Sequence, residues 1–203
     1  NEAVISARLG KVALGGGRDF TIDFAGNGLV SFLVADPDPA SATGSNFSNS
    51  VSNGGRIVAD GGTILMTVRS AVDIIGNVIN NTGIVQAQTV NNNGGVITLD
   101  AGPRGQIFVD NSSSGNTSVG GVIDATGAGG VNGGNITLLA DALYSGAASK
   151  IDVSGESGGT INLVLPVNSV SATDSVPPNQ NTRTELNIAS DAQLLANAGT
   201  SGT

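Results

Sequence analysis

The sequence predicts an all-β chain that folds as a parallel β-helix, a solenoid with three short strands in each coil. A phrase of one aliphatic residue, one variable residue and Ala or Val occurs six times, and five of the six phrases precede a strand that begins with glycine. Gly makes up 31 of the 203 residues, whereas charged residues make up 12% and aromatic residues 3%. A short unit that returns along the sequence is typical of solenoid proteins. A β-sandwich, which also has short strands and Gly-rich turns, is the alternative fold.

The recurring phrase predicts the first strand of each coil, and the glycine-led segment after it predicts the second. The six phrases lie at residues 5–7, 57–59, 85–87, 123–125, 151–153 and 194–196. The glycine-led strands begin at Gly10, Gly61, Gly94, Gly133 and Gly158. We expect their Ile, Leu, Val and Ala side chains to point inward and to stack about 4.8 Å apart from one coil to the next.

A third alternating stretch follows most of the second strands. Its apolar residues are Phe20, Ile22 and Phe24 in the first coil, and Ile107, Val109, Leu186 and Ile188 in later coils. The alternation is less regular near residues 72–79 and 142–144. The shortest interval between phrases is 28 residues, from Ile57 to Val85, so the longer intervals predict loop insertions near residues 36–52, 110–118 and 166–184. We expect residues 1–203 to form a single β-helix domain that is cut within a repeat at both ends.

Gly and Asn are expected at the corners between strands. Gly adopts positive φ at no steric cost, which suits a tight corner. Asn also tolerates the left-handed region, and its amide groups can stack into ladders. The segments NNTG at 80–83 and NNNGG at 91–95 are therefore predicted corners.

Charge and missing residue types argue against several functions. The net charge of −8 opposes nucleic-acid binding through a basic surface. The sequence has neither Cys nor His, so a disulfide framework, a thiolate metal site and a histidine base are absent. The apolar runs are too short for a transmembrane helix. We predict no catalytic, cofactor-binding or metal-binding residue, and we expect that the protein is not an enzyme.

Several segments resemble filamentous haemagglutinin-type exoproteins of two-partner secretion. They are residues 5–34, 78–88, 120–163 and 179–199, of which 5–27 is the most specific. The resemblance implies a right-handed parallel β-helix in an adhesin that is secreted or displayed on a Gram-negative bacterium. It also implies two partners, an outer-membrane β-barrel transporter and a ligand on a host or abiotic surface, such as a glycan. The NPNG-type secretion motif of the family does not occur in this sequence.

Two other functions stay open. Some members of the family that it resembles carry a toxin at their C-terminus. The protein could therefore be the stick domain of a contact-dependent inhibition protein. A carbohydrate-active β-helix enzyme is the other alternative, because Asp124 and Asp152 are expected at equivalent outward positions of successive coils. Two carboxylates about 5 Å apart could form an acid pair or a cation site. Equally, they could be solvated, as Ser6 and Gln86 occupy the same column. A loop around Phe47 is a further candidate for a binding contact.

Overall fold

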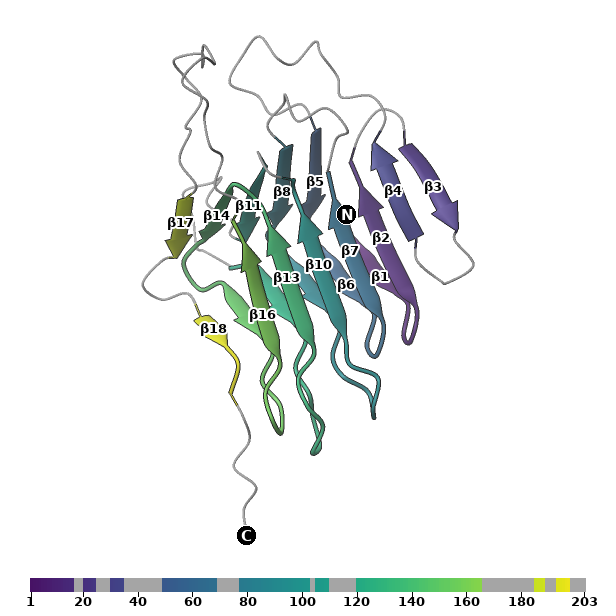
Figure 1. Ribbon diagram of the computed structural model, residues 1–203, viewed down its shortest axis with the longest axis vertical. Helices are drawn as coiled ribbons and strands as arrows, with labels where there is room; N and C mark the ends of the chain where they lie inside the picture. Colours follow the sequence, from purple (N-terminus) through teal and green to yellow (C-terminus); the bar gives the residue numbers. More distant parts are fainter. Residues whose placement is uncertain are drawn as a thin grey trace.

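The computed structural model confirms an all-β parallel β-helix of stacked three-strand coils (Figure 1). The structure describes residues 1–16, 20–24, 30–34, 49–68, 77–102, 105–109, 120–165, 185–188 and 193–197. Within these ranges every regular element is a strand. The same ranges hold no helix that is long and apolar enough to cross a bilayer.

Three parallel sheets run along the stack, and each full coil gives one strand to each sheet. The first sheet contains β1 (Val4–Ser6), β6 (Arg56–Val58), β9 (Ile84–Gln86), β12 (Val122–Asp124), β15 (Lys150–Asp152) and β18 (Gln193–Leu195). The second contains β2 (Lys11–Gly15), β7 (Thr63–Thr67), β10 (Val96–Asp100), β13 (Asn135–Leu139) and β16 (Thr160–Val164). The third contains β5 (Asn49–Asn53), β8 (Asn77–Asn81), β11 (Gln106–Val109), β14 (Ala142–Ser145) and β17 (Glu185–Ile188).

The register confirms the predicted first and second strands. In the first sheet, the leading aliphatic residues of all six phrases pair in one column, from Ile5 on Ile57 to Ile151 on Leu194. In the second sheet, the first inward residues of all five glycine-led strands do the same, from Val12 to Ile161. A slip by one residue would turn every inward residue outward, so the apolar core fixes this register.

The third strand of the first coil differs from the prediction. Residues Phe20–Phe24 form β3, which pairs antiparallel with β4 (Val30–Val34) as a hairpin beside β2 (Figure 1). The third-sheet position is taken by β5, so residues 49–52 of the predicted insertion are strand. Alternation of apolar and polar residues predicts a strand but does not predict which strand it pairs with. The next strand, Val30–Val34, is close enough in sequence to pair with Phe20–Phe24 as a hairpin. The less regular segments form β8 and β14. The predicted insertions at 110–118 and 166–184, with residues 36–48, lie outside the described residues.

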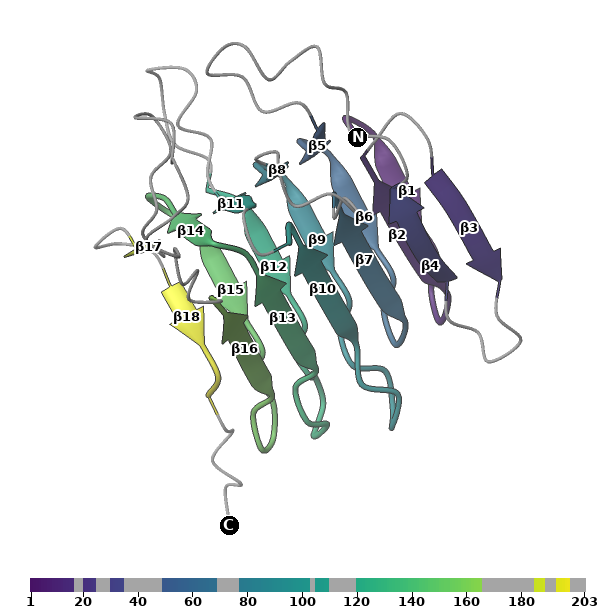
Figure 2. The same ribbon diagram turned by 45° about the horizontal axis from the view of Figure 1, so that its top comes forward.

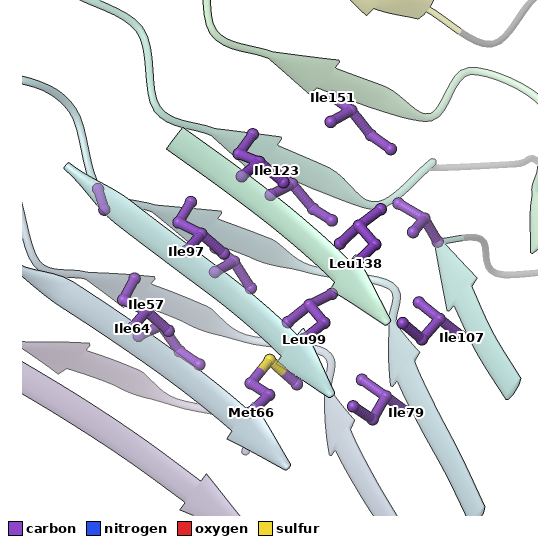
Figure 3. Close-up of a cluster of buried hydrophobic side chains, with 14 of the residues drawn as sticks. Ile57, Ile64, Met66, Ile79, Ile97, Leu99, Ile107, Ile123, Leu138 and Ile151 are labelled. Atoms are coloured by element: carbon purple, nitrogen blue, oxygen red, sulfur yellow. The ribbon is translucent and has the colours of Figure 1, made fainter. Parts of the chain in front are cut away.

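Aliphatic columns from the three sheets fill the interior (Figure 3). The side chains of the inner coils are completely buried, including Ile57, Ile64, Met66, Ile97, Leu99, Ile107, Ile123 and Ile151. The burial of one such residue contributes roughly 1.5–3 kcal/mol. Ile161 and Leu163 in β16, the last strand of the second sheet, are only partly buried. The core therefore depends on each coil having a neighbour on both sides.

The second glycine of each GG pair before a second-sheet strand allows the coils to approach closely. The residue after it donates to the glycine carbonyl one coil earlier, as Asn135 N does to Gly95 O at 2.9 Å. A Cβ at Gly134 would overlap that same Gly95 oxygen. Positive φ, which the sequence predicts for these corners, occurs instead at the first glycine of two pairs, Gly61 and Gly158. Close backbone approach is thus a second reason for the pairs.

The two Asn-rich corners differ in role: one forms the predicted side-chain ladder, and the other forms the predicted left-handed turn. Asn81 belongs to a buried ladder, because Asn1 Nδ2 donates to Asn53 Oδ1 at 2.9 Å and Asn53 Nδ2 donates to Asn81 Oδ1 at 2.9 Å. Asn81 Nδ2 continues the ladder to the Val122 carbonyl at 3.2 Å. Asn91 is exposed and has a φ of +54°, so it makes a left-handed turn. One motif joins coils, and the other reverses the backbone direction.

We expect Ile97→Ala to lower the free energy of unfolding by about 2–5 kcal/mol, because it empties a column position between two coils. Ile161→Ala, in the same column but at the partly buried end, serves as the matched control and should cost less. Urea denaturation followed by circular dichroism measures both. Equal losses would contradict the dependence of the core on two neighbours.

Two glycines test the close approach of the coils. A Cβ at Gly134 would overlap the Gly95 carbonyl oxygen of the preceding coil, whereas a Cβ at Gly94 meets nothing within 4 Å among the described residues. Gly134→Ala should therefore cost about 3 kcal/mol, and Gly94→Ala should stay within about 0.5 kcal/mol. The same denaturation experiment compares them, and similar stabilities of the two variants would show that the coils do not need the contact.

Candidate functional site

The outward side of the first sheet carries a regular set of polar side chains. Residues alternate between the two sides of a strand, so the variable residue of each phrase points away from the core, as do the residues two before and two after it. Figure 2 shows the strands of these coils, β6, β9, β12 and β15, side by side. We call this set the polar face; it comprises Arg56, Asp60, Gln86, Gln88, Asp124, Thr126, Lys150, Asp152 and Ser154.

Hydrogen bonds link the polar face across the second and third coils. Arg56 Nη2 donates to Gln86 Oε1 at 2.8 Å. Gln86 Nε2 in turn donates to both carboxylate oxygens of Asp60, at 2.9 and 3.1 Å. The amide group of Gln86 thus connects a cation to a carboxylate of the preceding coil. Because Gln has both a donor and an acceptor, it can satisfy these two partners at once.

Gln88 extends the same network to the fourth coil. Its backbone N–H donates to Asp60 Oδ1 at 3.1 Å. Its side-chain amide donates to Asp124 Oδ2 at 2.8 Å and to Thr126 Oγ1 at 3.2 Å. The backbone N–H of Thr126 reaches the second oxygen, Asp124 Oδ1, at 2.9 Å. Three coils are therefore joined by side chains as well as by the backbone ladder.

Asp152 is held by its own coil. Lys150 Nζ lies 2.7 Å from Asp152 Oδ2, and the Ser154 N–H donates to Oδ1 at 2.8 Å. Burial of this carboxyl raises its pKa, but the hydrogen bonds from Lys150 and Ser154 and the lysine charge outweigh that effect and leave the pKa below its ordinary value. The carboxylate is thus stabilised in its charged form.

The predicted alignment of Asp124 and Asp152 is present, since the two residues pair in register between β12 and β15. Their carboxylates take different partners, however, Gln88 for one and Lys150 for the other. A general acid needs a raised pKa, and that of Asp152 is lowered. Among the described residues, no three acidic groups come together in a way that could hold a metal ion. The candidate loop around Phe47 lies outside these residues.

A groove of about 450 Å³ runs along the corner beside the polar face. Its lining includes Gly54, Gly55, Gly83, Arg56 and Ile84. The lining residues come from successive coils, and the carboxylate of Glu2 lies beside Gly54 in the groove. Arg56 belongs to both the groove and the polar face, which makes the two surfaces continuous.

The outward side of the third sheet carries a stacked aromatic pair. The rings of Phe108 and Tyr144 lie 4.7 Å apart between centroids, with planes 9° from parallel. They occupy paired positions on β11 and β14. Such cross-strand pairs contribute roughly 0.2–1 kcal/mol each to a sheet, so this pair helps to hold two coils together.

Sequence reasoning missed several of these partners, although their signal is present. Lys150 lies two residues before Asp152, on the same side of one strand, and supplies the cation that the sequence did not suggest there. Gln88 lies two residues after Gln86, on the same outward side. The stack of Phe108 on Tyr144 follows once Ile107 and Leu143 are placed in one inward column.

No protein-family model, curated protein or solved structure matches this protein.

The stability of the protein should depend on Asp152 at acidic pH. Because its pKa is lower in the folded state, its contribution is complete above the ordinary aspartate pKa of about 3.9 and is lost as the pH falls through the lowered value. Asp152→Asn should therefore lessen the acid-induced loss of stability below about pH 4.

Urea midpoints measured across the acidic range compare wild type, Asp152→Asn and Lys150→Met. Lys150→Met keeps the carboxyl but removes its charged donor, so it should lessen the same pH dependence to a smaller extent. Parallel pH profiles for wild type and Asp152→Asn would rule out the stabilised carboxylate.

Proposed function

We propose that this protein is a structural and adhesive module of a large bacterial protein that is secreted or displayed on the cell surface. The stacking of coils in register supports this function more than any other observation. Each full coil is joined to the next full coil by backbone hydrogen bonds in all three sheets and by buried aliphatic columns. Such a solenoid holds surfaces at fixed positions along its axis, as a stalk or spacer must.

The polar face and the adjoining groove are the proposed contact surface. Accessible side chains such as Arg56 and Gln88 are already fixed by hydrogen bonds to neighbouring coils, so binding would cost little further entropy of side-chain ordering. The polar positions repeat at the coil spacing of about 4.8 Å. A surface of this kind suits many weak contacts with an extended polar polymer, such as a glycan on a host or abiotic surface, because linked contacts reinforce one another.

Export through an outer-membrane β-barrel transporter is part of the same proposal. It is supported by the resemblance of residues 5–34 and 120–163 to exoproteins of two-partner secretion. The absence of Cys from the sequence suits a polypeptide that crosses membranes before it folds. We therefore propose that the protein acts outside the cell.

Attachment of the purified protein to immobilised glycans and to cell layers tests the adhesive function. The double variant Arg56→Ala/Gln88→Ala should lose attachment by about fivefold or more, because truncating a residue that dominates an interface costs over 1 kcal/mol. The double variant Thr98→Ala/Thr137→Ala changes outward positions of the second sheet on neighbouring coils and is the matched control. It should attach like wild type, provided that urea denaturation finds all three proteins folded.

Two results would favour the alternatives. Release of sugar fragments by wild type but not by Asp124→Asn/Asp152→Asn would indicate a carbohydrate-active enzyme. A folded protein that attaches to none of the surfaces would contradict adhesion and would favour a stick domain, which needs the rod but no contact face.

A further inference from the structure

Asn-Gly dipeptides occur four times in the sequence, and the structure describes three of them in three different environments. They are Asn53-Gly54, Asn93-Gly94 and Asn132-Gly133; Asn27-Gly28 lies outside the described residues. Asn followed by Gly is chemically labile, since Gly has no side chain to hinder attack by its own backbone nitrogen. We infer that Asn93 is a site of spontaneous deamidation, at which the folded protein acquires an aspartyl or isoaspartyl residue.

The reaction needs no reagent other than water. The backbone nitrogen of Gly94 attacks Cγ of Asn93 and forms a new C–N bond. The bond from Cγ to the amide nitrogen Nδ2 breaks, and ammonia leaves with the proton that the Gly94 amide gives up. Water then opens the resulting succinimide at one of its two carbonyls, which yields aspartate or isoaspartate. Oxidation states do not change.

Asn93 and Gly94 meet the requirements of this reaction. Both are exposed, at the end of the tight turn that Asn91 makes with its positive φ. Backbone hydrogen bonds between Val90 and Asn93 close the turn, at 3.1 and 3.0 Å. The Gly94 N–H donates to no atom of the described residues, and the space at its Cα is open, with nothing within 4 Å of a Cβ built there. Within the described part of the chain, the attacking nitrogen therefore has no hydrogen bond that must break first.

The buried ladder protects Asn53. Its side chain is completely buried, and its amide donates to Asn81 Oδ1 at 2.9 Å and to the Ile84 carbonyl at 3.3 Å. The N–H of Gly54 donates to the Asn1 carbonyl at 2.9 Å. Both reacting groups of this dipeptide are held, so it reacts only when the ladder opens.

Asn132 lies between these two cases. It is exposed, as Asn93 is. The following N–H is occupied, however, because Gly133 donates to the Gly158 carbonyl of the next coil at 3.1 Å. Asn93 and Asn132 therefore differ in the hydrogen bond of the attacking nitrogen. Because this bond must break before the attack, we expect Asn132 to deamidate more slowly than Asn93.

The modification would alter the surface without entering the core. Residues 91–94 lie in the loop that joins β9 to β10 and are all exposed. The product adds one carboxylate to a protein of net charge −8, and isoaspartate lengthens the backbone by one methylene. The aliphatic columns begin again only at Ile97, so we expect the modified protein to remain folded.

Incubation of the folded protein in ¹⁸O-labelled water at mildly alkaline pH, followed by peptide mapping with mass spectrometry, tests the inference. Labelled product should accumulate first at Asn93, later at Asn132 and not at Asn53. Gly94→Ala should abolish the fast reaction at Asn93, because a methyl group hinders the attack, and the open space at this position leaves the fold intact. Electron-transfer fragmentation distinguishes the two products.

The same incubation in concentrated urea supplies the reference. Without structure, the three dipeptides should react at similar rates. The inference is overturned if Asn93 stays unmodified in the folded protein while it reacts in urea. It is overturned equally if Asn53 or Asn132 reacts first in the folded protein.

Discussion

The spacing of about 4.8 Å between successive coils is the constraint on which the rest of this structure depends. Parallel strands in register place equivalent residues directly above one another, so every position becomes a column. A column is stable only when its residues pack or hydrogen-bond favourably with similar residues one coil away. Aliphatic side chains do so inside the rod, as Ile64, Ile97 and Ile136 show. Glycine does so at a corner where a Cβ would meet the carbonyl of the preceding coil, and Asn53 and Asn81 do so because each amide donates and accepts.

Charged side chains are the least favourable ones to stack in a column. This gives a physical reason for the low fraction of charged residues. Two like charges about 4 Å apart repel by about 1 kcal/mol in water and by more near a protein surface. Only 12% of the residues are charged. Where Asp124 and Asp152 follow one another in a column, Gln88 and Lys150 supply hydrogen bonds or opposite charge. The polar face is thus built from amides and compensated charges, and its fixed arrangement is what makes it a candidate contact surface.

The repeat made much of the fold predictable from the sequence. A phrase that returns six times shows which residues share a column, and the structure places all six phrases in one register. The first-coil third strand could not be predicted in the same way, because Phe20–Phe24 alternates as well as a solenoid strand does but pairs locally with β4. The polar face was predictable only in part. Its positions follow from alternation, whereas the partner of Asp152 depends on which way the long side chain of Lys150 turns.

Distances between spin labels along one column, measured by electron spin resonance, test the stacking of the coils in register most directly. The protein has no cysteine, so labels attach only at cysteines that are introduced. Ala13, Leu65 and Asn162 point outward in one column of the second sheet, with Ala13 four coil steps and Leu65 three steps from Asn162. Stacking in register predicts narrow distributions centred near about 19 Å and about 14 Å between backbone positions, a difference of one coil. Broad distributions, or equal distances for the two pairs, would contradict it.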